Sequence, residues 1–162
     1  MQETITIRAA VVTASDSRTI EGDVSGRRAK LLLESIGAEV AEHKVISDDL
    51  ETIAAELTAL SDRPDINLII TTGGTGLGPR DNTPVATLKV IEREVAGIPE
   101  AMRRETATQT PTAILSRSVA GTRNGTLIIN LPGSPKGVEE CFHVIAPIML
   151  HAIRMVTGDT KH

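Results

Sequence analysis

The sequence predicts an α/β fold in which helices cover both faces of a mainly parallel sheet that includes one antiparallel pair. Three observations support this prediction. Short apolar segments rich in β-branched residues alternate with longer segments of helical periodicity, as in successive βαβ units. The segment LIITT at residues 68–72 is typical of a buried strand. Asn124-Gly125, between two strand-like segments, is a strong hairpin signal and accounts for the antiparallel pair.

Apolar periodicity and capping residues set the expected boundaries of each element. The expected strands are residues 7–14, 38–46, 68–72, 112–120 and 126–131. The expected helices are residues 25–36, 84–95, 99–107 and 136–156. One more helix is expected between the first two of these, opened by Ser47 and Asp48 and running to about residue 60. Gly37 ends the first of these helices, because a glycine just past the last turn accepts the left-handed conformation.

The loop after the third expected strand is the most informative part of the chain. Residues 67–84 read NLIITTGGTGLGPRDNTP, with glycines at positions 73, 74, 76 and 78 that permit positive φ or close approach of a ligand. Thr83 as N-cap and Pro84 at the first helical position begin a helix whose free N–H groups suit a phosphate. Pro79 breaks both the dinucleotide and the P-loop motifs. A tight turn without ligand is the alternative, but Asp81 is not needed for capping and could hold a magnesium ion.

A second strand-to-helix junction repeats this pattern at residues 126–138, TLIINLPGSPKGV. Pro132-Gly133 follows the strand, Ser134 is the expected N-cap and Pro135 begins the helix. Taken alone, this loop is explained as a helix cap. Because ligands of open α/β sheets bind outside the carboxyl ends of the strands, the two glycine loops are expected to face one crevice.

Three aspartates lie at or just beyond expected carboxyl ends of strands: Asp16, Asp48 and Asp81. Asp16, in the sequence SDS, is either a turn residue or a ligand. Asp48 is either part of a capping box with Glu51 or a catalytic group, and Asp49 is its less favoured substitute. Asp81 is the strongest candidate of the three.

Length and composition favour one domain spanning residues 1–162 and exclude several classes of partner. The net charge of −4, with no Trp, no Tyr and only Phe142, argues against nucleic acid. No leader-like segment is seen and no apolar run approaches the length of a membrane span, so a cytoplasmic protein is expected. Cys141, the lone cysteine, is interpreted as a core thiol, and the histidines lack metal-ligand spacing.

The segments TTGGTGLGPRDNTPVAT, PTAILSRSVAG and TLIINLPGSPKGVEEC resemble the molybdopterin adenylyltransferase family, which comprises the bacterial Mog proteins and the G domains of gephyrin and its plant counterpart. The resemblance runs along nearly the whole chain, from VVTASDS onward. It implies a three-layer α/β/α sandwich, commonly trimeric with a hexamer as the alternative, and contact with the molybdenum insertase. It also implies that Mg²⁺-bound ATP adenylylates the terminal phosphate of molybdopterin and releases pyrophosphate.

The resemblance carries roles over position by position. Asp48 and Asp81 would serve as catalytic residues and as magnesium ligands, although ISDD replaces the family's Pro-Asp-Glu segment and leaves Asp49 as the alternative to Asp48. The nucleotide would contact Gly73, Gly74, Thr75, Gly76 and Arg80. The molybdopterin would contact Ser15, Asp16, Ser116, Pro132, Gly133 and Ser134. No general base is required, because a phosphate monoester is largely ionised near neutral pH.

Two alternatives from other classes remain. One is a molybdopterin-binding or scaffolding protein like the MoaB-type relatives, without ATP turnover. The other is a nucleotide-processing enzyme like the N-terminal domain of competence-damage proteins. Retention of Arg80-Asp81 and of LSRSVAG favours the adenylyltransferase, since a protein that only binds pterin does not need the magnesium carboxylate.

Overall fold

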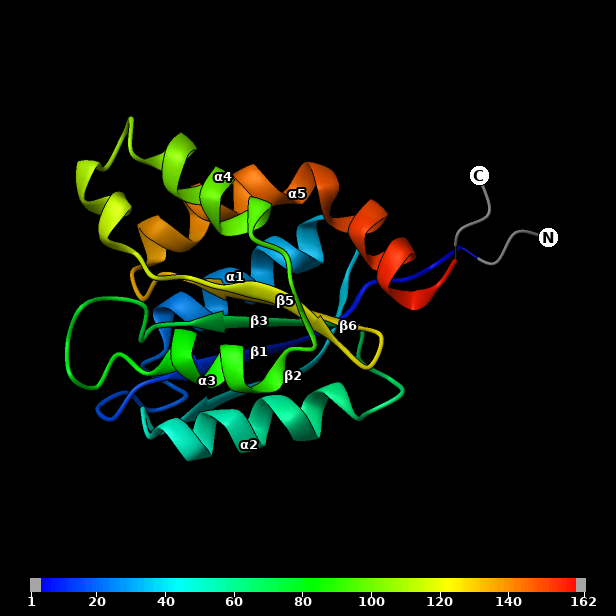
Figure 1. Ribbon diagram of the computed structural model, residues 1–162, viewed down its shortest axis with the longest axis horizontal. Helices are drawn as coiled ribbons and strands as arrows, with labels where there is room; N and C mark the ends of the chain where they lie inside the picture. Colours follow the sequence, from blue (N-terminus) through cyan, green and yellow to red (C-terminus); the bar gives the residue numbers. More distant parts are fainter. Residues whose placement is uncertain (1–3, 160–162) are drawn as a thin grey trace.

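The computed structural model describes residues 4–159 and contains a six-stranded sheet with strand order β2-β1-β3-β6-β5-β4 (Figure 1). The strands are β1 Arg8–Ala14, β2 Glu39–Ile46, β3 Leu68–Thr72, β4 Arg93–Glu94, β5 Ala120–Arg123 and β6 Thr126–Leu131. The helices are α1 Val24–Ser35, α2 Leu50–Ser61, α3 Thr83–Val90, α4 Gly97–Thr106, the 3₁₀ helix η1 Pro111–Leu115 and α5 Pro135–Thr157. β2, β1, β3 and β6 pair in parallel, whereas β5 pairs antiparallel with both β6 and β4.

Two apolar cores lie on opposite faces of the sheet, as strand alternation requires. On one face, Val11, Ile70 and Ile129 pack with α1, α4 and α5. On the other face, Val12 and Ile69 pack with α2 and α3. Figure 1 shows these helices as layers above and below the strands. The predicted three-layer α/β/α architecture, with a mainly parallel sheet and an antiparallel hairpin at Asn124-Gly125, is confirmed.

Two sequence predictions of secondary structure are wrong. The strand expected at residues 112–120 does not form over residues 112–119, because Pro111 begins the 3₁₀ helix η1 and the strand β5 starts only at Ala120. The third predicted helix was too long, since α3 ends at Val90 and residues 93–94 form the edge strand β4. Gly121 makes this possible: a Cβ there would lie 2.6 Å from the Arg93 carbonyl oxygen, so only glycine lets this segment pack closely against β5.

The expected caps of two helices also change. Asp49, not Ser47 or Asp48, caps α2 by accepting a hydrogen bond of 2.9 Å from the Thr52 amide. Thr83 is the first residue of α3 and makes no capping bond, and the preceding Asn82 makes none through its side chain either. Ser134 caps α5 as predicted, accepting from the Gly137 amide at 3.1 Å.

Helix α5 corrects the expectation that no apolar segment approaches the length of a membrane span. Among residues 4–159, α5 is the one helix whose length and apolar composition would suffice to cross a bilayer. Its buried side chains, among them Val138, Phe142, Ile145 and Met149, pack in the core against the sheet. These contacts account for the apolar side chains on the buried face of α5, and 28% of its apolar window is buried.

Candidate active site

The candidate residues gather at the edge of the sheet where the parallel strands end. Residues 15–23 follow β1, 47–49 follow β2, 73–82 follow β3 and 132–134 follow β6. Residues 116–119, which precede the antiparallel β5, reach the same edge. The strand order places β3 between β1 and β6, so both glycine loops flank the end of a central strand. This is the position where open α/β sheets bind ligands.

The first glycine loop is held close to the end of β1. Gly73 and Gly74 have φ of +83° and +68°, a conformation that residues with a Cβ rarely adopt. A Cβ on Gly73 would lie 2.6 Å from the Ala14 carbonyl oxygen. Farther along, the Gly78 amide donates to Asp81 Oδ2 at 2.8 Å, which fixes the Asp81 carboxylate at the base of the loop.

Arg117 braces this loop from the segment before β5. Its amide donates to the Thr75 carbonyl at 2.9 Å. Its guanidinium donates to the carbonyl oxygens of Gly76 and Asp81 at 2.8 and 2.6 Å. Three bonds to three carbonyls fix the path of the loop over seven residues. Arg117, within LSRSVAG, was not among the residues predicted from the sequence.

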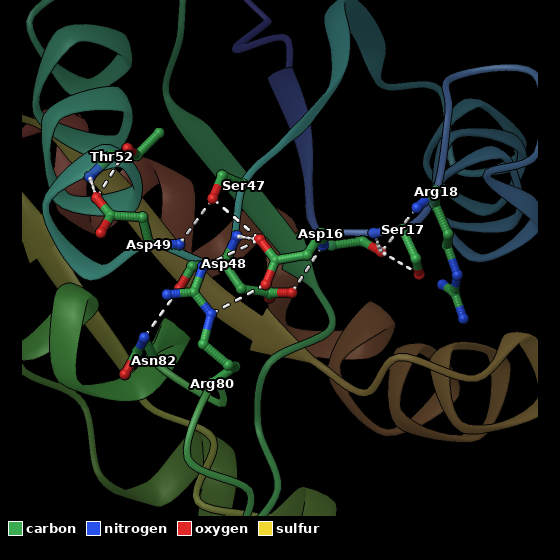
Figure 2. Close-up of polar contacts among 10 residues, drawn as sticks. Asp16, Ser17, Arg18, Ser47, Asp48, Asp49, Thr52, Arg80 and Asn82 are labelled. Carbon is green, nitrogen blue, oxygen red and sulfur yellow. Dashed lines mark hydrogen bonds and ion pairs between the residues drawn. The ribbon is translucent and has the colours of Figure 1, made fainter.

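Asp16 and Asp48 form the acidic centre of the site (Figure 2). Asp48 Oδ2 accepts from the Asp16 amide at 2.9 Å, and Asp16 Oδ1 accepts from the Asp48 amide at 3.1 Å. The Arg80 guanidinium forms a two-pronged ion pair with Asp16, at 2.9 and 3.1 Å. Asn82 Nδ2 donates to the Asp48 carbonyl at 2.9 Å and ties the β2 loop to the start of α3.

The charges around Asp48 favour a cation. The hydrogen bond from Arg80, with that from the Asp48 amide, lowers the pKa of Asp16 to about 2. Burial raises the pKa of Asp48, and the negative charges of Asp16 and Asp81 add to this rise. The hydrogen bond from the Asp16 amide and the positive charge of Arg80 oppose it only in part. A positive ion beside Asp48 would offset these unfavourable effects.

The same surroundings separate Asp48 from Asp49. The Asp49 carboxylate accepts from both the amide and the hydroxyl of Thr52, each at 2.9 Å. These bonds lower the pKa of Asp49 and direct it toward α2. Asp48 points toward Asp16 and Arg80 instead, as Figure 2 shows.

The second glycine loop lies against the first. A Cβ on Gly133 would lie only 3.3 Å from the Gly73 Cα. The Gly133 carbonyl accepts from the Ser25 hydroxyl at 2.6 Å and from Arg18 Nη1 at 3.1 Å. The loop after β1 and the start of α1 therefore clamp the second glycine loop. Neither Ser25 nor Arg18 stood out in the sequence, since these contacts span more than 100 residues.

A pocket of about 530 Å³ opens beside the second loop. Thr75 and Gly76 of the first loop line it together with Ser116, Pro132 and Ser134. Arg103, Thr106 and Lys136 add polar groups, and Cys141 lies on its wall. Arg103 Nη1 donates to the carbonyls of Ser116 and Ser118 at 3.2 and 3.1 Å and holds this wall in place. Burial raises the pKa of Cys141 to about 11, which fits an inert thiol.

The structure brings most of the predicted residues together but divides them differently. Asp48, Asp81, Arg80 and the first glycine loop lie at the ends of β2 and β3. Ser116, Pro132, Gly133 and Ser134 lie at or beside the pocket. Ser15 and Asp16, which were predicted to contact the pterin, line a separate open hollow beside β2 together with His43 and Ser47. Asp16 contacts Asp48 and Arg80, which belong to the predicted nucleotide group.

The donor set fits a magnesium ion that is shared with a phosphate. No cluster of three or more His, Cys, Asp or Glu side chains within residues 4–159 could hold a metal by itself. Mg²⁺ does not require one, because it keeps several waters and is usually bound by one or two carboxylates together with substrate phosphates. Asp48, in the loop after β2, and Asp81, in the loop after β3, could supply those carboxylates.

Together these features define a class of protein: an α/β/α sandwich whose two glycine loops, each followed by a helix, meet beside a pair of carboxylates at the carboxyl edge of the sheet. The family model described as "Probable molybdopterin binding domain" matches residues 10–151, and the chain belongs to this family. The resemblance seen in the sequence is thereby confirmed.

Three similar proteins carry names from molybdopterin and molybdenum cofactor synthesis. The chain is 38% identical over 158 residues to a Helicobacter pylori protein named molybdopterin adenylyltransferase, covering 95% of this chain and 90% of that protein. A crystal structure of the molybdopterin biosynthesis enzyme MoaB from Thermus thermophilus has a TM-score of 0.87 and 41% identity, covering 94% of this chain and 98% of that one. The molybdenum cofactor synthesis protein cinnamon of Drosophila melanogaster is 39% identical over 93% of this chain, which spans 26% of that longer protein.

Proposed function

We propose that this protein acts in molybdenum cofactor biosynthesis as a molybdopterin adenylyltransferase that uses Mg²⁺ and ATP. One observation carries the proposal: the two glycine loops lie against each other at Gly73 and Gly133, next to the loops that carry Asp48 and Asp81 and beside a pocket. Such an arrangement suits two phosphorylated substrates whose reacting groups must meet. The names of the relatives support the same activity.

The nucleotide side is assigned to the first glycine loop. Gly73, Gly74, Thr75 and Gly76 would line the phosphates, and Arg80 would pair with one of them after leaving Asp16. Asp48 and Asp81 would hold the Mg²⁺. When bound, this ion would supply neutralisation of the charge on the phosphate oxygens. The tightly braced loop keeps Asp81 in place through Gly78 and Arg117.

The pterin side is assigned to the 530 Å³ pocket. The N-terminus of α5, which Ser134 caps, would receive the terminal phosphate of molybdopterin with Ser116, Pro132 and Gly133. Lys136 and Arg103 on the lining carry the positive charge that a phosphate requires. Ser15 and Asp16 line the hollow beside β2 and are not among the residues that line this pocket, so we assign Asp16 to orienting Asp48 and Arg80.

The reaction needs alignment more than covalent help. A terminal phosphate oxygen of molybdopterin would attack the α-phosphorus of ATP, and the bond from that phosphorus to pyrophosphate would break. The protein would hold both phosphates in line and offset the developing charge through amide groups, helix ends and Arg80. No histidine is required, because the attacking phosphate is already ionised near neutral pH.

A MoaB-like protein that binds molybdopterin without ATP turnover is the second candidate, because relatives with that name are equally similar. One assay separates the two: release of pyrophosphate from ATP and Mg²⁺, measured with and without molybdopterin. Pyrophosphate released only when molybdopterin is present supports the adenylyltransferase. Tight pterin binding with no pyrophosphate would establish the binding protein instead.

We further propose that residues 1–162 act as a single cytoplasmic domain that assembles as a homotrimer and passes its product to the molybdenum insertase. Exposed aliphatic side chains on α1 and α5, including Leu31, Ile148, Leu150 and Met155, support self-association. A hexamer is the alternative assembly.

A further inference from the structure

Thr83 carries a buried hydroxyl that has no hydrogen-bond partner within residues 4–159. The residue is completely buried at the start of α3, 0% exposed. Its main chain is fixed on both sides: its amide donates to the Gly74 carbonyl at 3.2 Å, and its carbonyl accepts from the Thr87 hydroxyl at 2.8 Å. An unpaired buried hydroxyl lowers the free energy of unfolding, that is, it destabilises the folded protein. A valine would fill about the same volume without this destabilisation.

The position of the hydroxyl points to its partner. A Cβ on Gly74 would lie 2.4 Å from Thr83 Oγ1 and 3.5 Å from Asp48 Oδ1, so both oxygens face the space beside the Gly74 Cα. Asp48 uses Oδ2 for its bond with the Asp16 amide, while Oδ1 makes no hydrogen bond within the described part of the chain. The Thr83 hydroxyl, a donor without an acceptor, therefore lies near Asp48 Oδ1, an acceptor without a donor. Between them is Gly74, which has no side chain.

We propose that Thr83 is a positioning residue that donates its hydroxyl hydrogen to Asp48 Oδ1 when a nucleotide and its metal are bound. The inference rests on the proposed function, since it assumes that Asp48 is a metal ligand. Carboxylates that bind metals are usually oriented by a further hydrogen bond. The Asp16 amide supplies this bond to Oδ2 already in the free protein, and Thr83 supplies it to Oδ1 in the complex.

The geometry also explains why position 74 is glycine. An alanine there would bring its Cβ into the space between Thr83 Oγ1 and Asp48 Oδ1, and φ of +68° would add backbone strain. In this interpretation, Gly74 keeps the path between the hydroxyl and the carboxylate open.

The test measures Mn²⁺ binding calorimetrically in the presence of α,β-methylene-ATP, which cannot be cleaved at the reacting bond. Thr83→Val should weaken Mn²⁺ binding about tenfold, the usual lower limit for loss of an outer hydrogen bond to a metal ligand. Its melting temperature without ligand should stay equal or rise, because the unpaired hydroxyl is removed. Thr83→Ser should restore Mn²⁺ binding to nearly the wild-type value.

Thr87→Val is the matched control. Thr87 lies one turn farther along α3 and is equally buried, but its hydroxyl donates to the Thr83 carbonyl and accepts from Asn130 Nδ2 at 2.9 Å. This variant should lower the melting temperature and leave the Mn²⁺ affinity of the nucleotide complex unchanged. The two threonines should thus show opposite patterns of stability and metal binding.

Two results would overturn the inference: wild-type Mn²⁺ binding by Thr83→Val, or a weakened binding that Thr83→Ser does not restore. Asp48→Asn tells this failure apart from a failure of the proposed function. If Asp48→Asn loses Mn²⁺ binding while Thr83→Val retains it, only the role of Thr83 is wrong. If Asp48→Asn also binds Mn²⁺ normally, the assignment of the metal ligand is wrong.

Discussion

Asp16 and Asp48 bind each other's main-chain amides, so that each carboxylate fixes the other's backbone at the ends of β1 and β2. The two loops are thereby joined at the sheet edge by bonds of 2.9 and 3.1 Å. Arg80, from the loop after β3, closes over the pair by binding Asp16. The strand-to-helix connections after β1, β2 and β3 are thus linked through one exposed aspartate.

Asp16→Ala should reduce turnover roughly tenfold by releasing Asp48 and Arg80, with little change in stability because Asp16 is exposed. The measurement is pyrophosphate release as a function of Mg²⁺ concentration, together with a molybdopterin titration. A raised Mg²⁺ requirement with normal pterin affinity supports the orienting role. Lost pterin affinity with a normal Mg²⁺ requirement would return Asp16 to the pterin side.

Asp48→Asn and Asp81→Asn should each abolish pyrophosphate release while the protein stays folded, because the change is nearly isosteric but removes a metal-ligand charge. Asp49→Asn is the matched control. Asparagine caps helices about as well as aspartate, so this variant should retain both the cap of α2 and the activity. If Asp49→Asn is the inactive variant, the metal ligand has been placed one residue too early.

Ser134→Arg should weaken molybdopterin binding at least about tenfold, because the arginine side chain crowds the N-terminus of α5. A tenfold loss of affinity corresponds to about 1.4 kcal/mol of binding free energy. Binding of ATP at the first glycine loop should persist. The chain has no Trp or Tyr, so pterin absorbance near 280 nm stands out in a titration. Ser134→Ala serves as the control, since it loses the same cap, at about 1 kcal/mol of stability, without adding bulk. Equal effects of both variants on pterin binding would contradict the steric explanation.

Acid should destabilise the protein through Asp23, a fully buried aspartate that accepts hydrogen bonds from Thr13 and the Gly26 amide and pairs with His43 at 2.7 Å. Although burial raises the pKa of Asp23, these bonds outweigh it and lower the pKa below the usual 3.8. The folded-state pKa is depressed, so this stability is fully present above pH 3.8 and is lost as pH falls below it.

Asp23→Asn should therefore lose about 2 kcal/mol of unfolding free energy at pH 7, the usual contribution of hydrogen bonds to a charged group, and should show a shallower decline in acid. Denaturant unfolding between pH 7 and pH 3 measures both effects. Asp62→Asn, on the exposed end of α2, is the control and should behave like the wild type. A wild-type pH dependence in Asp23→Asn would show that other groups govern acid unfolding.

Light scattering at micromolar concentration should give the mass of a trimer. Exposed aliphatic residues on α5 provide the means to perturb it, and Leu150→Glu should reduce the mass if this face is an interface. A monomeric wild-type protein would contradict the proposed assembly. A hexamer would favour the MoaB-type relatives.

The general architecture could be predicted because local patterns agree with the fold. LIITT, the helix-starting prolines and Asn124-Gly125 each specify one element, and parallel strands bring the loops after them to one edge. The segment at residues 112–120 could not be predicted in this way. Its structure depends on Pro111 and on the contact of Arg117 with the Thr75 loop, some 40 residues away.

The choice among neighbouring aspartates also exceeded what the sequence could provide. Ser47, Asp48 and Asp49 are all acceptable N-caps, and only the position of Thr52 shows that Asp49 takes this role. Likewise, Ser15 and Asp16 line a different hollow from the pocket beside the second glycine loop, in keeping with the strand order, in which β3 separates β1 from β6. Spacing along the chain does not contain that information.

The ends of the described chain lie on the side of the molecule away from the glycine loops (Figure 1). Thr4, at the start, and Thr157, at the end of α5, line the same small hollow. Additional sequence attached at either end would therefore leave the glycine loops accessible, and a host protein could accommodate the whole unit between two nearby attachment points. The longer Drosophila relative contains such a unit within a much larger polypeptide. For laboratory use, the same geometry allows affinity tags or surface tethers at either terminus.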